Sequence, residues 1–292
     1  MRYTQLAIFL LFSFQLVAQY GSFDAAAVKK ARELPTVVVL DDGDTPYNRA
    51  IMDAIKAEWK FSGEHEFVKA GDLAMQPIVP EKLYLLKTSK TDPKKFEGTF
   101  LTLVQGWKLK KNQTLDRKGN AFTELPAEQE LAFILIDEKM LSEKNNAQML
   151  LIYVKHLQDY LKLVESGKIT DKTTADRTYQ ERNRLIKELE LLIGKEHLDQ
   201  TLPDLATIKA EYKAGVAIVP VAELMNTVQQ QDGTKAITDV VLTVGDHRNK
   251  HCFKRVFNAG TGELMYQRDD AAIYGKKEGF MIDDLKTIER AR

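Results

Sequence analysis

The sequence predicts an α+β fold, with α/β as the alternative, built from two small mixed β-sheet units with covering helices. Short runs of β-branched and aliphatic residues, typical of buried strands, occur in residues 20–140 and again in residues 201–292. Between them, residues 141–200 carry apolar side chains at helical spacing and predict an antiparallel helical hairpin. The segments Phe67–Leu73 and Ile218–Leu224 are weakly similar, which favours two related units, with coincidence as the alternative.

The first unit is predicted to begin with a short helix within Phe23–Leu34, followed by a buried strand at Thr36–Leu40. Thr45 then offers a hydroxyl group to cap a helix whose first position is Pro46. Apolar residues at four-residue spacing give that helix one apolar face. We expect the remaining strands of this unit at His65–Val68, Lys82–Thr88, Thr99–Val104 and Leu131–Ile136.

The helical hairpin starts with a strongly periodic helix. Its apolar residues alternate steps of four and three and form a narrow seam of the coiled-coil type, namely Leu150, Val154, Leu157, Leu161 and Val164. Gly167 ends this helix, and a second helix is expected over Thr173–Ile193, with Gly194 as its stop. We expect the seam and the sheet edges to contact a protein partner or a second copy of the chain.

The second unit is predicted to alternate strands and helices and to close with a β-hairpin. Its turn, Asn258–Glu263, contains the glycines that hairpin turns favour. Strands are expected at Gly215–Val219, Ile237–Val244, His251–Phe257 and Leu264–Tyr266. Helices are expected at Val221–Gln231 and Asp284–Arg290, with Asp283 as the cap of the last helix.

Residues 1–19 have the pattern of a cleaved secretory signal peptide. Arg2 supplies a positive charge, and Leu6–Ala18 form an apolar run that ends in a small residue. Because spanning a bilayer takes about 20 apolar residues, we expect no transmembrane anchor after signal cleavage. The sequence therefore predicts a protein that is periplasmic or secreted.

Charge and cysteine content narrow the possible partners and compartments. Lysine and arginine number 42, as do aspartate and glutamate, and this balance argues against nucleic acid as a partner. Cys252 is the only cysteine, so an intramolecular disulfide is impossible. Within a predicted strand, Cys252 is best interpreted as a small buried apolar residue, with a reactive thiol or an intermolecular disulfide as the alternative.

A group of acidic residues after the first strand gives the clearest indication of chemistry. The strand runs into Asp41–Asp44, and a later strand ends near Asp246. This arrangement resembles haloacid dehalogenase-type phosphatases, which use a nucleophilic aspartate, a second aspartate as general acid and late aspartates that hold magnesium. The resemblance implies that Asp42, Asp44 and Asp246 would form the catalytic set. The geometry is reasonable, since carboxylates at strand ends converge at one sheet edge.

The sequence departs from that phosphatase pattern at two positions. Pro46 stands where the family has a threonine, and Lys250 stands where it has a late aspartate. The acidic residues are equally well explained as a strand-to-helix turn, in which aspartates accept hydrogen bonds from backbone N–H groups. A metal-dependent hydrolase is therefore kept as the alternative function only.

Two sets of residues form weak candidate metal sites. Asp41, Asp42 and Asp44 could offer oxygen ligands to calcium, but the twelve-residue loop with a closing glutamate is missing. His247 and His251 are four residues apart, a spacing that places side chains on one face only in a helix. This stretch is predicted to be loop and strand, so we expect no metal and no cofactor.

Four stretches of the chain carry a further resemblance. They are Thr45–Ile51 with Trp59, Phe67–Val68, His251–Phe257 and Gly262–Tyr266. Together they resemble a loose group of exported bacterial proteins of unknown function with paired α/β units. The resemblance implies export and two such units, and it brings no catalytic residue to assign.

Common catalytic motifs are missing from the sequence, which has no Gly-x-Ser-x-Gly, phosphate-binding loop or dinucleotide-binding glycine pattern. We therefore predict an exported, non-catalytic binding or scaffold protein of the cell envelope. Its partner is expected to be a protein or a second copy of this chain, and no nucleic acid.

Overall fold

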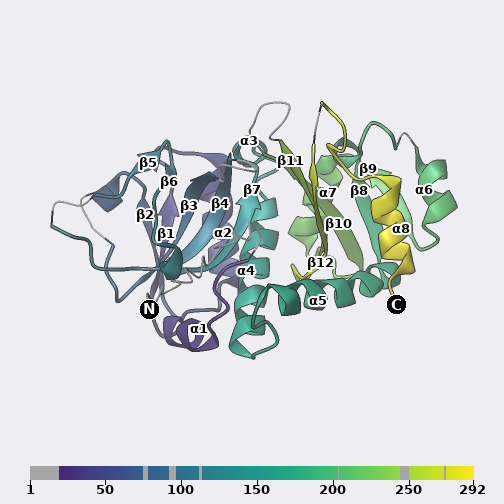
Figure 1. The fold of residues 1–292 in the computed structure, drawn as a ribbon. Coiled ribbons are helices and arrows are strands. Elements are labelled where there is room, and N and C mark those ends of the chain that lie inside the picture. Colours follow the sequence, from purple (N-terminus) through teal and green to yellow (C-terminus); the bar gives the residue numbers. More distant parts are fainter. Residues whose placement is uncertain are drawn as a thin grey trace, which may run out of the picture.

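The computed structural model describes residues 20–74, 78–91, 97–111, 114–202, 204–243, 250–272 and 274–292. Within them the chain forms two mixed β-sheets with helices between and around them, which confirms the predicted α+β class (Figure 1). The predicted signal peptide, residues 1–19, lies outside the described residues. No helix in the described part of the chain is long and apolar enough to cross a membrane.

The first sheet has the strand order β2-β1-β3-β4-β7, with a small β5–β6 ribbon attached to β3. β1 lies parallel to both β2 and β3, whereas β4 is antiparallel to β3 and to β7. The strands are β1 (Thr36–Leu40), β2 (His65–Lys69), β3 (Leu83–Thr91), β4 (Glu97–Gln105), β5 (Arg117–Lys118), β6 (Ala121–Phe122) and β7 (Glu130–Ile136).

The second sheet repeats this topology. Read from β9, its order is β9-β8-β10-β11-β12, with β8 parallel to β9 and β10, and with antiparallel pairs after β10. Its strands are β8 (Glu190–Gly194), β9 (Val216–Val219), β10 (Lys235–Leu242), β11 (His251–Asn258) and β12 (Leu264–Ala271). The two similar segments Phe67–Leu73 and Ile218–Leu224 begin in β2 and β9, which hold corresponding places in the two sheets.

The helices pack on different faces of the two sheets. One continuous hydrophobic core joins α1, α2, α4 and α7 to residues of both sheets, while α6 and α8 cover the other face of the second sheet. The helices are α1 (Ala25–Ala31), α2 (Pro46–Glu58), α3 (Glu138–Ser142), α4 (Met149–Glu165), α5 (Lys172–Arg182), α6 (Leu205–Glu211), α7 (Val221–Gln230) and α8 (Ile282–Arg290). The 3₁₀ turns are η1 (Asp72–Ala74), η2 (Ala127–Gln129), η3 (Asn183–Glu188) and η4 (Lys195–His197).

The helix start after β1 follows the sequence pattern closely. Thr45 Oγ1 accepts a hydrogen bond from the backbone N–H of Asn48 at 3.2 Å, and Pro46 is the first helical residue, as predicted. The Asn48 side chain returns this support, because its Oδ1 accepts from the Asp41 backbone N–H at 2.7 Å. These bonds fix the strand-to-helix turn that carries the acidic residues.

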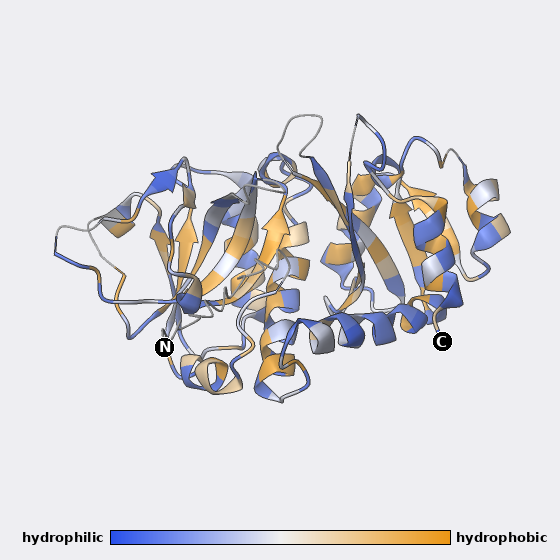
Figure 2. Cartoon of the chain, in the orientation of Figure 1, coloured by the Kyte–Doolittle hydropathy of each residue, from blue (hydrophilic) through white to orange (hydrophobic). Residues whose placement is uncertain are grey.

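The apolar seam of α4 lies in the shared core between the two sheets. Its five residues, Leu150, Val154, Leu157, Leu161 and Val164, are each 0% exposed. In Figure 2, hydrophobic residues gather on the strands and on α4, whereas α5 is mostly hydrophilic. The seam that was expected to contact a partner is therefore occupied by the chain's own core.

The second helix of the hairpin is shorter than the sequence predicts, and its expected end at Ile193 is wrong. α5 ends at Arg182, η3 follows, and Glu190–Gly194 form strand β8. A short apolar run fits either helix or strand, and here pairing with β9 and β10 decides. In Figure 1, α5 runs crosswise to α4, and it contacts β12.

One buried histidine of α4 makes the fold sensitive to acid. His156 is 4% exposed, its Nδ1 has no hydrogen-bond partner among the described residues, and its ring lies 5.6 Å from that of Phe257. Burial lowers the pKa of His156 from 6.5 to about 4. The unfolded chain therefore binds a proton near pH 6.5 that the folded chain binds only near pH 4. The resulting stability is complete above pH 6.5 and falls as the pH drops toward 4.

We expect the wild-type chain to lose about 2 kcal/mol of unfolding free energy from this group between pH 7.5 and pH 5. His156→Phe removes the titrating group, so urea titrations at the two pH values should differ less for this variant than for the wild type. Part of the acid sensitivity should remain, because burial also lowers the pKa of His197. His65→Gln, at an exposed position of β2, is the control. An unchanged pH dependence in His156→Phe would contradict the assignment.

Candidate functional site

The acidic residues after β1 do not converge on one point. Asp41 is 6% exposed, and its carboxylate lies 2.6 Å from the ammonium of Lys87, which also pairs with Glu138 at 3.0 Å. Lys87 in turn lies over the ring of Tyr47, 4.5 Å from its centroid. Burial is the main cause that raises the pKa of Asp41. This buried group joins β1, β3, α2 and α3.

Asp42 and Asp44 face solvent and have partners of their own. Asp42 accepts hydrogen bonds from Arg117 Nη1 at 2.7 Å and from the Gly71 backbone N–H at 2.8 Å. The bond from Arg117 is the largest cause that lowers the pKa of Asp42. Asp44 pairs with Arg49 at 2.7 Å. The three aspartates thus pair with three different basic side chains.

The other predicted site residues add no ligand set that the structure describes. Asp246 and His247 lie outside the described residues, and His251 begins β11, where its backbone bonds to Thr243. Among the described residues, no group of three histidine, cysteine, aspartate or glutamate side chains could hold a metal ion. The hydrolase alternative therefore stays a prediction that needs an assay.

We expect Asp42→Asn to leave any magnesium-dependent phosphatase signal of the purified protein at the level of the wild type and of buffer. The variant loses one exposed ion pair with Arg117, which is worth about 0–1 kcal/mol. Hydrolysis of p-nitrophenyl phosphate with magnesium, together with a melting curve, measures both effects. Hydrolysis above background by the wild type that Asp42→Asn abolishes would contradict this expectation and support the hydrolase.

Cys252 is buried within β11 with 0% exposure. Burial raises the pKa of its thiol to about 12, so the nucleophilic thiolate is essentially unpopulated at neutral pH. Its interpretation as a small buried strand residue is confirmed, and the reactive-thiol alternative is disfavoured.

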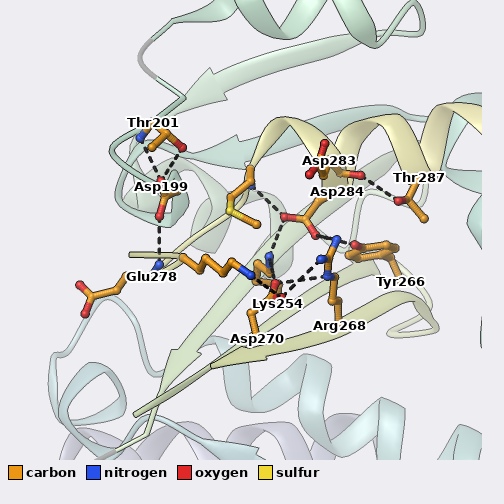
Figure 3. Close-up of polar contacts among 12 residues, drawn as sticks. Asp199, Thr201, Lys254, Tyr266, Arg268, Asp270, Glu278, Asp283, Asp284 and Thr287 are labelled. Carbon is orange, nitrogen blue, oxygen red and sulfur yellow. Dashed lines mark hydrogen bonds and ion pairs between the residues drawn. The ribbon is translucent and has the colours of Figure 1, made fainter. Parts of the chain in front are cut away.

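A cluster of buried charges that the sequence analysis missed lies between β11, β12 and α8 (Figure 3). Lys254 and Asp284 are both 0% exposed, and the Lys254 ammonium lies 2.7 Å from Asp284 and 2.6 Å from Asp270. Tyr266 donates its hydroxyl to Asp284 at 2.6 Å. These contacts join α8 to β11 and β12.

The start of α8 corrects a detail of the prediction. The helix begins at Ile282 with Met281 as its N-cap residue, and Asp283 is exposed. Asp284 accepts the hydrogen bond from the Met281 backbone N–H at 2.8 Å. The predicted capping role of Asp283 is therefore wrong, because the next residue reaches that N–H while it also binds the buried lysine.

A cleft of about 540 Å³ separates the two units at one end of the second sheet. We call it the inter-unit cleft. One wall comes from the first unit, from α3 and the loop that follows it (residues 137–146). The other wall comes from η4, the first residues of α7, the end of β10 and Glu278. Its volume lies within the range of about 300–1,000 Å³ that small-molecule sites occupy.

The position of the inter-unit cleft in the sheet is the position where open α/β sheets bind ligands. Its second wall contains His197 after β8, Val221 after β9 and Leu242 at the end of β10. These three strands are parallel, so their carboxyl ends meet at this edge. From β8 the chain continues to β9 on one side, and from β10 it continues to β11 on the other side. The boundary between the neighbouring strands β8 and β10 is therefore a topological switch point.

Buried polar contacts support the floor of the cleft. His197 is 6% exposed, and its Nδ1 lies 2.9 Å from the Thr238 hydroxyl, which also accepts from the Gly194 backbone N–H. Burial lowers the pKa of His197, so its ring is neutral at neutral pH. This site could not be predicted from the sequence, because β8, which sets its edge, was expected to be helical.

No family model, no curated protein and no solved structure matches the chain. The resemblance to exported bacterial proteins therefore stays a prediction, and the geometry of the described residues carries the functional argument.

Proposed function

We propose that this chain is an exported, non-catalytic binding protein of the cell envelope, and that its ligand occupies the inter-unit cleft. The cleft at the switch point of the second sheet is the observation that carries the proposal. Its two walls come from different units, which is a usual place for ligand sites. Export, to the periplasm or the medium, is supported by the apolar leader in the sequence.

The two walls belong to one packed body. The Arg255 guanidinium, from β11, donates to the Leu135 carbonyl of β7 at 2.9 Å and pairs with buried Asp239. α4 contributes to a core shared by both sheets. Because these contacts are buried, the cleft is preformed, and ligand binding needs no closure of one unit onto the other.

The exposed side chains of the described residues favour a small ligand over a large protein partner. Among the described residues, Tyr274 is the one exposed large hydrophobic side chain. The cores of stable protein interfaces are rich in such side chains. The protein partner or second copy that the sequence predicts is therefore the less favoured occupant.

Filling the cleft tests the proposal. Ala222 is exposed at the second position of α7 and lines the cleft, so Ala222→Trp places an indole in it. Ala206 is exposed at the second position of α6, away from the cleft, and Ala206→Trp is the matched control. We expect ligand-observed NMR with a fragment library to find binders of the wild type and of Ala206→Trp that Ala222→Trp no longer binds. Fragments that bind Ala222→Trp as well as they bind the wild type, or the absence of any binder, would contradict the proposal that the cleft holds a ligand.

Export is tested separately. Intact mass measurement of the protein from the periplasm or the medium should show a chain that lacks its N-terminal residues up to about residue 19. A full-length chain recovered from the cytosol would contradict export while leaving the cleft proposal to its own test.

A further inference from the structure

We infer that the inter-unit cleft takes a small organic cation, an alkyl ammonium or guanidinium compound with an apolar portion. This inference rests on the proposed function and adds the chemical class of the ligand. It follows from the charges on the two walls, the partners those charges have, and the apolar side chains between them.

Both walls of the cleft carry acidic side chains. Asp137 and Glu143 stand on the wall of the first unit, and Glu196 and Glu278 stand on the wall of the second. Lys144 is the one basic side chain of the described lining, since His197 is neutral. Because carboxylates stand on both walls, a cation bound in the cleft would be attracted from either side. A cleft lined by one sign of charge also concentrates ligands of the opposite sign.

Three of these carboxylates have only neutral partners within the described residues. Asp137 accepts from the Met140 backbone N–H at 3.1 Å, Glu143 from the Asn146 amide at 2.8 Å, and Glu196 from the Val221 backbone N–H at 3.2 Å. Glu278 differs, because it pairs with Lys250 at 2.6 Å. The negative charge of the first three is thus left for a ligand to neutralise.

The spread of the acidic groups favours an organic cation over a metal ion. No three of the described acidic, histidine or cysteine side chains lie close enough together to hold a metal. A metal ion requires several ligand oxygens at about 2.0–2.6 Å, whereas an extended molecule with more than one amino group can reach both walls. Met140 on one wall and Val240 and Leu242 on the other supply apolar surface for its carbon chain.

Three probes of equal chain length test the charge class by calorimetry. They are 1,8-diaminooctane, 1,8-octanediol and octanedioate, measured at low salt and again with added sodium chloride. We expect the diamine to bind and the other two to bind at least tenfold more weakly. The affinity for the diamine should fall with salt, because charge attraction is screened.

Two charge-removing variants connect that binding to the cleft. Glu196→Gln and Asp137→Asn keep oxygen acceptors for the backbone N–H groups that they cap, and each should weaken diamine binding by about fivefold or more. Glu128→Gln, an exposed carboxylate outside the cleft, is the control and should leave the affinity unchanged.

The outcomes distinguish a failure of the cation inference from a failure of the proposal that the cleft binds a ligand. Equal binding of the diol, tighter binding of octanedioate, or loss of binding in Glu128→Gln alone would overturn the cation inference. If none of the three probes binds, but fragments still bind the wild type and not Ala222→Trp, the cation inference would be wrong and the proposed function would stand. Failure of the fragments as well would end both.

Discussion

Replacing Asp284 with alanine is expected to lower the free energy of unfolding by about 3–5 kcal/mol. The substitution leaves Lys254 at 0% exposure with one of its two carboxylate partners, and it also takes the acceptor from the Tyr266 hydroxyl. A buried ammonium that loses a partner is still removed from water but has one attractive charge less to compensate for it. α8 also loses the bond between Asp284 and the Met281 backbone N–H.

Urea unfolding followed by circular dichroism measures this effect. Asp283→Ala is a close control, because Asp283 is the neighbouring residue on the same helix turn but points to solvent (Figure 3). Its loss should cost less than about 1 kcal/mol, the size of an exposed charge near a helix N-terminus. Similar losses in the two variants would show that the buried cluster contributes little to stability.

The second large effect is expected at Leu157 in α4. Leu157→Ala removes a fully buried side chain from the core that both sheets share and should cost about 2–5 kcal/mol. Because both sheets pack on the same helix, the destabilised protein should still unfold in a single transition. The unfolding midpoint should move to lower urea concentration while the transition keeps its slope.

Lys162→Ala, at an exposed position of the same helix, is the matched control and should change stability by less than about 0.5 kcal/mol. Two separate transitions in Leu157→Ala, followed by near- and far-ultraviolet circular dichroism, would contradict the shared core. They would show instead that each unit is stable without the other.

Most strands were predictable because their apolar runs are short and bounded by turn residues. β1, β4 and β7 appear within two residues of their expected limits, and α2 begins at Pro46 as predicted. β8 was missed because its leucines continue the helical spacing of the preceding leucines, Leu185 and Leu189. Its conformation is set by neighbours that are distant in sequence, Val216–Val219 and Lys235–Ile237.

The candidate site was less predictable than the fold. The acidic turn after β1 was visible as a motif, but the sequence could not show that Lys87, Arg117 and Arg49 each pair with a different aspartate of it. The inter-unit cleft has no local motif at all. Its walls come from Asp137, Glu196 and Glu278, which are far apart in the chain and meet only through the sheet topology.

The burial of α4 between the sheets bears on how the protein would behave after a break in its chain. Gly167, just beyond α4, lies in an exposed turn with a positive φ of 72°. A protease nick there would leave the helix on one fragment and all five strands of the second sheet on the other, with an extensive apolar contact still joining them. The two pieces would remain a non-covalent pair in native buffer and separate only in denaturant.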